Sequence, residues 1–384
     1  MISELLGIGS TELFALFLVF LAVFAVLVTA LLAIGFFTAQ ALPFGLYAYA
    51  ISRMRVMKGK MIGEKKLKAL IESYDSEEII SAFEGTVYEQ FIPITKSIEE
   101  IENALSKALA ATYSKVVEIS PQQAKEFFKL MNARYDVLNI KKILESKQGK
   151  ETDLDLYPST FSEAFLQRLI DAGTADEAID LLKESPHYKF AQLVESASSK
   201  NYDYLLDKYL YDSLLSRNRI ASLAQKVGML NDLDILTELF GVQADLINIK
   251  LVLRAKMGSN STDLLLDRML SNGFELNEPK RKSLAEADSV NEVVSLLEGT
   301  IYFNALNEKL SDALKEKRAS LMEPALDALY LKKIRSAFSR QAFGLSPIVS
   351  FLLLKEKEIQ TLRTILNGIE EGLPKQMISE MVVY

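Results

Sequence analysis

The chain has no cysteine and only one histidine, His187, among its 384 residues. Without cysteine there can be no disulfide, no thiolate nucleophile and no cysteine-ligated metal. A Ser-His-Asp relay would depend on His187 alone, and a zinc site built on two histidines is excluded. His187 follows Ser185 and Pro186 in a predicted turn, where we expect it to be exposed. These absences remove most of the familiar catalytic arrangements.

Glycine and proline are also scarce, with 17 and 9 residues, whereas leucine, alanine, glutamate and lysine abound. This balance favours long helices with short connections, and no stretch shows sustained strand-type alternation. We therefore predict an all-α fold. The net charge of −7 argues against a broad nucleic-acid surface, so no nucleic-acid partner is expected.

Catalytic motifs are missing as well. The sequence has no Walker-type string, in which glycine is followed four residues later by Gly-Lys-Ser/Thr. Its carboxylates show no spacing that singles out an acid/base pair. We predict a protein that is not an enzyme and that holds no cofactor and no metal.

Charged residues are absent from residues 13–52, and the stretch from Leu13 to Ala39 is almost wholly Leu, Phe, Val and Ala. About 20 such residues cross the roughly 30 Å hydrocarbon core of a membrane. A cleaved signal peptide would begin with positive charge, whereas Glu4 and Glu12 precede this run. We predict that residues 1–44 form a retained transmembrane anchor that ends near Pro43. Its span includes Leu13, Leu18, Val26, Leu31 and Ala39.

Basic residues follow the apolar run immediately. They are Arg53, Arg55, Lys58, Lys60, Lys65, Lys66 and Lys68. The positive-inside bias then places the large C-terminal part in the cytoplasm, at the cell membrane. Arg53, Arg55 and Lys58 are candidates for contact with lipid headgroups or with an acidic protein surface beside the membrane.

One short motif occurs three times, at spacings of 109 and 113 residues. Its polar positions are Asp136, Asn139 and Lys141, then Asp245, Asn248 and Lys250, and then Glu358, Thr361 and Arg363. A single active site cannot explain a motif that recurs in this way. We expect the short polar side chains to bond to neighbouring helix ends and to define a structural repeat of about 110 residues.

Other landmarks keep the same period. Residues 77–88 match residues 291–302, and residues 176–188 lie between them as the middle copy. We place the helical modules at 45–174, 175–289 and 290–384. Three copies of one module favour a pseudo-threefold body with room for an axial hole.

Several of these stretches resemble one family. Residues 47–57 resemble the opening helix of the C-type subunits of archaeal-type (A-type) ATP synthases, which are related to the d-type subunits of V-type ATPases. The motif copies around Asn139 and Asn248 fit the repeated motif of that family, as do residues 354–359, 363–368 and 372–374. The resemblance covers about residues 45–384.

The resemblance implies a non-catalytic rotor component. In that family a funnel-like body of three related helical modules sits on the membrane ring of proteolipids, the c ring, and receives the D and F proteins of the central stalk. It couples the A3B3 catalytic head indirectly to H⁺ or Na⁺ transport during ATP hydrolysis or synthesis. Arg53, Arg55 and Lys58 are then candidates for contact with the ring loops or with lipid headgroups.

The N-terminal span departs from the usual pattern, because many relatives lack one. A rotating component is not free to turn if it is anchored in stationary lipid outside the ring, so we expect this helix to run through the lumen of the c ring. The alternative function is a membrane-anchored helical-repeat adaptor or scaffold that recruits cytoplasmic partners.

Overall fold

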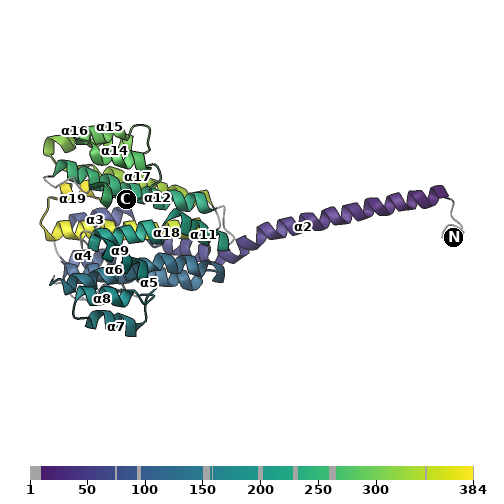
Figure 1. The fold of residues 1–384 in the computed structure, drawn as a ribbon, viewed down its shortest axis with the longest axis horizontal. Coiled ribbons are helices and arrows are strands. Elements are labelled where there is room, and N and C mark those ends of the chain that lie inside the picture. Colours follow the sequence, from purple (N-terminus) through teal and green to yellow (C-terminus); the bar gives the residue numbers. More distant parts are fainter. Residues whose placement is uncertain are drawn as a thin grey trace. The chain divides into compact units, whose positions relative to one another are not determined.

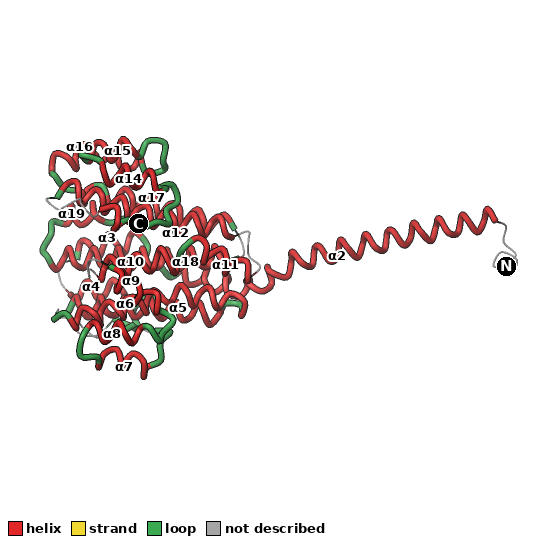
Figure 2. The backbone as a smooth tube through the Cα atoms, viewed as in Figure 1, coloured by secondary structure: helices red, strands yellow, loops and turns green. Residues whose placement is uncertain are grey.

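The computed structural model describes residues 10–73, 76–92, 97–149, 156–157, 159–197, 202–227, 232–258, 265–341 and 344–383. Side chains at 10–13, 39–44, 46, 76–77, 203 and 226–227 are not part of that description. Every regular element in the described ranges is helical, which confirms the predicted all-α class (Figure 2). The chain divides into two compact units, residues 1–49 and residues 50–384.

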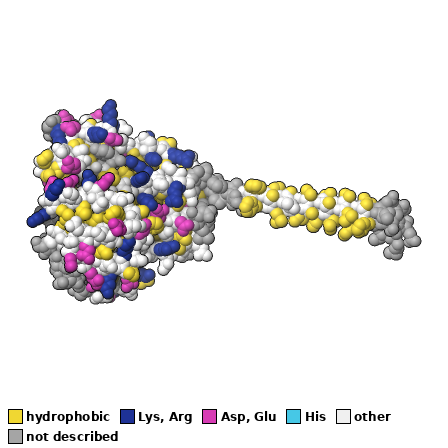
Figure 3. All heavy atoms as spheres, turned by 90° about the horizontal axis from the view of Figure 1, so that it is seen from above, with side chains coloured by type: hydrophobic (Ala, Val, Ile, Leu, Met, Phe, Trp, Pro, Cys, Tyr) yellow, Lys and Arg dark blue, Asp and Glu magenta, His cyan; other side chains and the backbone are white. Residues whose placement is uncertain are grey.

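The first unit is the larger part of a 50-residue helix, α2 (Ser10–Gly59). The stretch Phe14–Thr38 has a mean hydropathy of 3.1, and none of it is buried. Figure 3 shows hydrophobic side chains along this helix without interspersed charge. By length and composition, this is one helix that could cross a membrane. The helix does not end at Pro43, because it continues to Gly59.

The second unit holds all the other helices (Figure 1). Its first part contains α3 (Glu64–Glu72), α4 (Ser76–Phe83), α5 (Ile98–Ile119), η1 (Gln122–Ala124), α6 (Lys125–Lys147), α7 (Glu163–Asp171), α8 (Ala175–Leu182), α9 (Tyr188–Ser196), α10 (Tyr202–Lys208) and the π-helical turn η2 (Tyr209–Leu214). The rest contains α11 (Arg217–Val227), α12 (Leu233–Met257), α13 (Leu265–Arg268), α14 (Glu278–Glu286), α15 (Val290–Leu296), α16 (Phe303–Glu316), η4 (Ala319–Leu321), α17 (Glu323–Arg340), α18 (Leu345–Glu370) and α19 (Lys375–Met381).

Local sequence explains where the short helices begin. Thr174 caps α8 by accepting a hydrogen bond from the backbone N–H of Glu177, and the Glu177 carboxylate accepts from the N–H of Gly173. Ser289 and Glu292 make the same reciprocal pair at α15. Such pairs satisfy N–H groups that have no partner inside the helix. Pro324 lies in the first turn of α17, where its missing N–H costs no helical hydrogen bond.

The three longest helices of the second unit, α6, α12 and α18, are buried on most of their faces. Shorter helices cover them and form separate apolar clusters. One cluster joins α6 to α7–α10 through residues such as Ile140, Leu182 and Tyr209. It extends across residue 174, where we placed a module boundary, and the boundaries remain a prediction.

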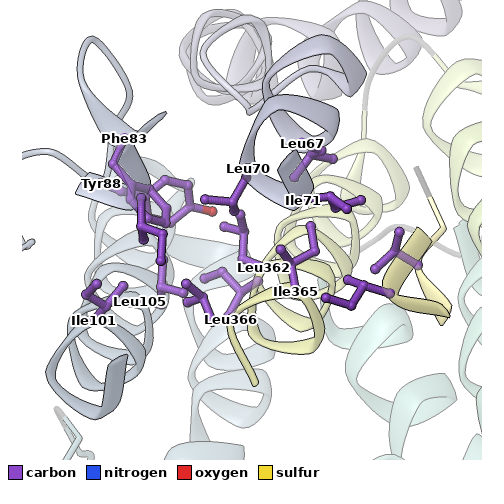
Figure 4. Close-up of a cluster of buried hydrophobic side chains, with 14 of the residues drawn as sticks. Leu67, Leu70, Ile71, Phe83, Tyr88, Ile101, Leu105, Leu362, Ile365 and Leu366 are labelled. Atoms are coloured by element: carbon purple, nitrogen blue, oxygen red, sulfur yellow. The ribbon is translucent and has the colours of Figure 1, made fainter. Parts of the chain in front are cut away.

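A second cluster joins the two ends of the chain. Leu67 and Leu70 from α3 and Tyr88 pack against Leu362 and Leu366 from α18 (Figure 4). Burying one leucine side chain stabilises a fold by about 1.5–3 kcal/mol. In Figure 1 the purple α3 accordingly lies beside the yellow α18 and α19.

Candidate functional site

The repeated motif places a buried carboxylate in the middle of each long helix. Asp136 on α6 accepts hydrogen bonds from the hydroxyls of Ser159 and Thr160, from the Thr160 N–H at 2.8 Å, and from His187 Nε2 at 3.2 Å. Three residues later, Asn139 bonds to both the N–H and the C=O of Tyr157, each at 2.9 Å. Burial raises the pKa of Asp136, but the hydrogen bonds to its charged form outweigh it and lower the pKa below its usual range.

His187 is not exposed as we expected. It is 2% exposed, and its Nδ1 lies 2.9 Å from the hydroxyl of Tyr209, while Nε2 faces Asp136. The turn after Ser185 folds inward because the backbone N–H of His187 is held by the Ser185 hydroxyl at 3.0 Å. The sequence carried a signal for this burial, because His187 aligns with Tyr88 and Tyr302 in the repeat.

The second carboxylate is that of Asp245 on α12, and the turn that follows α13 packs around it. Its Oδ2 accepts from the backbone N–H groups of Phe274, Glu275 and Leu276 at 2.7–3.3 Å and from the Tyr302 hydroxyl at 2.7 Å. Asn248 bonds to the N–H and C=O of Leu270.

Asp245 differs from Asp136 in its electrostatics. All four of those hydrogen bonds reach one carboxylate oxygen, while the buried Oδ1 has no partner among the described residues. Burial therefore dominates and raises the pKa of Asp245 despite the hydrogen bonds that oppose it.

The third carboxylate is that of Glu358 on α18. Two of its donors come from residues 62–88, far earlier in the sequence, and one comes from α18 itself. Glu358 accepts from the backbone N–H of Ile62, from the Tyr88 hydroxyl at 2.5 Å and from Lys355 at 2.6 Å. Thr361 donates to the C=O of Val383 at 3.1 Å. Burial lowers the pKa of the Lys355 ammonium, although the Glu358 carboxylate opposes this shift.

The three sets of bonds follow one order along the sequence. The backbone partner of the second motif position lies 18 residues after Asn139, 22 after Asn248 and 22 after Thr361. In the first two sets, donors to the carboxylate follow at 159–160 and at 274–276, and then the ring donors His187 and Tyr302. In the third set, residues 62–88, from far earlier in the sequence, supply a backbone N–H and a tyrosine hydroxyl to Glu358. Segments nearly 300 residues apart therefore complete one polar cluster.

A second polar layer lies two residues before each carboxylate, at Arg134, Gln243 and Glu356. Arg134 forms a salt bridge with Glu356, and both side chains are 15% exposed. Each of these three side chains is hydrogen-bonded to a tyrosine from another helix. Tyr113 donates to Glu356, and Tyr330 donates to Gln243 at 3.2 Å. At the third position the direction is reversed, because Arg134 donates to the hydroxyl of Tyr211 at 3.2 Å.

Burial is the main cause of the raised pKa values of these tyrosines, and that of Tyr211 rises to about 12. All three phenols therefore remain neutral at neutral pH. Our sequence reasoning missed this layer. The signal that would have found it is the constant offset of two residues from the repeated acid, which brings an arginine and a glutamate into equivalent positions.

The third motif position varies more. Lys250 pairs with Asp327 at 2.8 Å, and Lys357 pairs with the same carboxylate at 2.6 Å. Burial would raise the pKa of Asp327, but these two ammonium groups lower it. Arg363 donates to the Ser106 hydroxyl, and Lys141 is half-buried.

The predicted membrane-related residues lie on α2. Leu18, Val26 and Leu31 are exposed, at 48–68%. Leu13 and Ala39 fall where the structure gives helical backbone but no side-chain description. In the second unit, Arg53 and Arg55 are exposed, whereas Lys58 is half-buried with its Nζ 3.9 Å from the centre of the Phe338 ring.

The polar side chains of these clusters form hydrogen bonds with backbone groups and with other side chains of the fold. Within the described residues, no group of three or more His, Asp or Glu side chains is arranged to hold a metal ion. The arrangement fixes helices against each other: Asp136 and Glu358 bond within the fold through both carboxylate oxygens, and Asp245 bonds through Oδ2.

These features define an all-helical protein built on a repeated polar clamp, with one helix long and apolar enough to span a membrane. Residues 50–381 match the model of the ATP synthase (C/AC39) subunit family, and the chain belongs to that family. It is 30% identical over 351 residues to the C-type subunit of the A-type ATP synthase of Methanocaldococcus jannaschii, covering 88% of this chain and 86% of that protein.

Two further relatives carry the same name. The protein from Methanobrevibacter smithii is 29% identical over 353 residues, which are 88% of each chain. That from Methanothermobacter thermautotrophicus is 30% identical over 344 residues, covering 88% of this chain and 87% of the relative. The chain is therefore an ATP synthase subunit of the A-type family, and such complexes are associated with membranes.

Proposed function

We propose that this chain is the rotor component that couples the central stalk of an A-type ATP synthase to its membrane c ring, without catalysing a reaction itself. Family membership is the observation that carries the proposal. The polar clamps support it, because a part that transmits torque must hold its helices in fixed positions. The exposed stretch Phe14–Thr38 supports a membrane attachment of this rotor component.

The proposed partners follow from this role. The proteolipid c ring and membrane lipid meet the N-terminal part, the D and F proteins of the central stalk meet the helical body, and the A3B3 head is reached only through the stalk. The body lies on the cytoplasmic side of the cell membrane, because basic residues follow the apolar helix. The coupling ion, H⁺ or Na⁺, is selected in the ring.

Co-purification tests this function. An affinity-tagged full chain should bring c ring, stalk and head with it in a fixed ratio. A membrane-anchored adaptor would instead recover other cytoplasmic proteins without that stoichiometry. Recovery of the chain free of ring and stalk from cells that contain the assembled synthase would refute the coupling role.

The N-terminal helix has its own test. Because the chain has no cysteine, Val26→Cys creates a single thiol in the middle of the apolar stretch. If the helix lies in the lumen of the c ring, a cross-linker on that thiol should capture inner ring helices. Capture of peripheral lipid or of the membrane stator would place the helix outside the ring and contradict the lumenal position.

A further inference from the structure

Basic charge is concentrated on one short part of this acidic protein. Residues 50–68 contain seven lysines and arginines but only one acidic residue, Glu64. Residues 69–384 contain 37 basic and 48 acidic side chains. A local excess of positive charge on an otherwise acidic protein attracts negatively charged partners to that surface.

The basic residues that face solvent at the end of α2 have no carboxylate partner within the described structure. Arg53 and Arg55 on α2 and Lys60 directly after it are exposed. Several cations elsewhere in the body are paired, among them Arg134 with Glu356 and Lys250 with Asp327. The positive charge of the three exposed side chains is therefore available to a partner outside the chain.

A second element adds to this surface. Lys58 lies over the ring of Phe338 on α17, and Arg335 is three residues before Phe338, on the same helical face. Burial lowers the pKa of Lys58, and the charge of Arg335 lowers it further. Two cations from distant parts of the sequence are thus held close together, and Arg335 is exposed without a carboxylate partner among the described residues. Repulsion of this kind is relieved when an anion binds.

We propose that this basic surface, formed by Arg53, Arg55 and Lys58 of α2, by Lys60 directly after it and by Arg335 of α17, binds the headgroups of anionic phospholipids. The inference rests on the proposed membrane attachment and names its lipid partner. The same helix carries the exposed apolar stretch Phe14–Thr38, so the lipid surface is the nearest anionic surface along the chain.

The uncharged run is longer than the bilayer, so a helix perpendicular to the membrane would hold the basic surface beyond the headgroups, and a tilted helix brings it to them. At about 1.5 Å per residue, the helical run from 13 to 52 is about 60 Å long, whereas a bilayer with its headgroups measures about 40–45 Å. When the run is centred, Arg53 begins about 8–10 Å beyond the headgroups. This distance is close to the Debye length at physiological salt, and the long arginine side chain shortens it.

The test measures which lipid lies beside α2 in the full chain. Val56 is 57% exposed, and Val56→Cys supplies a single thiol for a fluorophore. The labelled protein is placed in equimolar phosphatidylcholine and phosphatidylglycerol bilayers. One of the two lipids at a time carries a spin label near its headgroup, which quenches the fluorophore.

We expect quenching by phosphatidylglycerol to exceed quenching by phosphatidylcholine, and high salt to remove the difference. One basic side chain near an anionic surface changes affinity about fivefold. The variant Arg53→Gln/Arg55→Gln/Lys60→Gln should therefore lower the preference at least about tenfold. Arg335→Gln should lower it alone, because the proposed site includes α17.

A matched variant, Lys129→Gln/Lys189→Gln/Lys309→Gln, removes the same charge from exposed lysines elsewhere and should keep the preference. Equal quenching by the two lipids, or an unchanged preference after both α2 and Arg335 substitutions, would overturn the proposal. If the α2 variant instead loses only co-purification with the c ring, the basic surface binds protein and the coupling function stands. Failure of a fluorophore at Val26→Cys to enter the bilayer would contradict the membrane attachment itself.

Discussion

At the scale of single residues, the donors around the three carboxylates explain why a lone histidine is buried. Tyr88 and Tyr302 donate to Glu358 and Asp245, and His187 takes that place beside Asp136. A buried carboxylate without donors is costly, whereas one with several hydrogen bonds is stable. The histidine is thus a structural donor, and its interchange with tyrosine can be tested.

We expect His187→Phe to lower the free energy of unfolding by about 1–3 kcal/mol, because Asp136 and Tyr209 each lose a partner. His187→Tyr should lower it less, because a phenol can donate to Asp136 as it does in the other two sets. Thermal unfolding of the detergent-solubilised full chain measures both. A tyrosine variant as unstable as the phenylalanine variant would show that the three positions are not equivalent.

The pH dependence of stability should reveal the opposite pKa shifts of Asp136 and Asp245. The pKa of Asp136 is lowered in the folded protein, so its stabilisation is present at neutral pH and is lost as pH falls through that pKa. The pKa of Asp245 is raised, so its contribution is present at low pH and is lost as pH rises through the folded pKa.

Asp136→Asn should therefore flatten the loss of stability on acidification below about pH 4, whereas Asp245→Asn should remove a gain of stability on acidification from neutral pH toward about pH 4. Denaturant titrations at several pH values provide the measurement. Each variant serves as the control for the other, since both remove one buried carboxylate. Slopes that change in the same direction would contradict the assigned shifts.

At the scale of elements, the turn after α13 wraps closely around the Asp245 carboxylate. A Cβ atom added at Gly273 would lie 2.0 Å from Asp245 Oδ1, which no side chain can occupy without a shift. Gly273→Ala should cost about 2 kcal/mol or more, by displacing the N–H groups that bind Asp245. Gly59→Ala meets nothing within 4 Å and should change stability by less than about 1 kcal/mol. Equal melting temperatures for the two variants would contradict this account.

The Arg134–Glu356 pair joins α6 to α18 and can be examined with a double-mutant cycle. Arg134→Met leaves Glu356 buried beside Tyr113 without its cation and should cost about 3–5 kcal/mol. Glu356→Gln combined with Arg134→Met should recover a large part of that loss, since no uncompensated charge remains. Strictly additive losses would mean that the pair contributes no coupling between the helices.

Much of the helical content could be predicted, because few glycines and prolines interrupt the apolar periodicity. Thr174 is a typical N-cap residue and indicates where α8 begins. The exposed apolar helix also followed from its length. The burial of His187 was missed because a histidine after proline in a turn is usually solvated, and only its tertiary partners decide otherwise. The bond between Ile62 and Glu358 joins positions 296 residues apart, and no local pattern predicts it.

At the scale of the whole second unit, its first helices and its last helices pack together in one structure. Residues 62–88 bring to Glu358 the donors that the other carboxylates receive from segments further along the sequence. The apolar cluster of α3, α4 and α5 with α18 and α19 joins the same two ends, with Ile378 from α19 buried in it.

This closure predicts the effect of shortening the C-terminus. Truncation after Gly372 removes α19, whose Ile378 is 1% exposed and whose Lys375 donates to the C=O of Glu72 at 2.6 Å. Amide hydrogen exchange should then accelerate in α3 and α4, about 300 residues away in sequence, because they lose part of their packing partner. The cluster of α6 with α7–α10 shares none of these contacts and should keep its protection. Unchanged exchange in α3 and α4 would show that the N-terminal segment is held without the C-terminal helix, whereas equal acceleration in α8 and α9 would indicate global loosening instead of loss of a local partner.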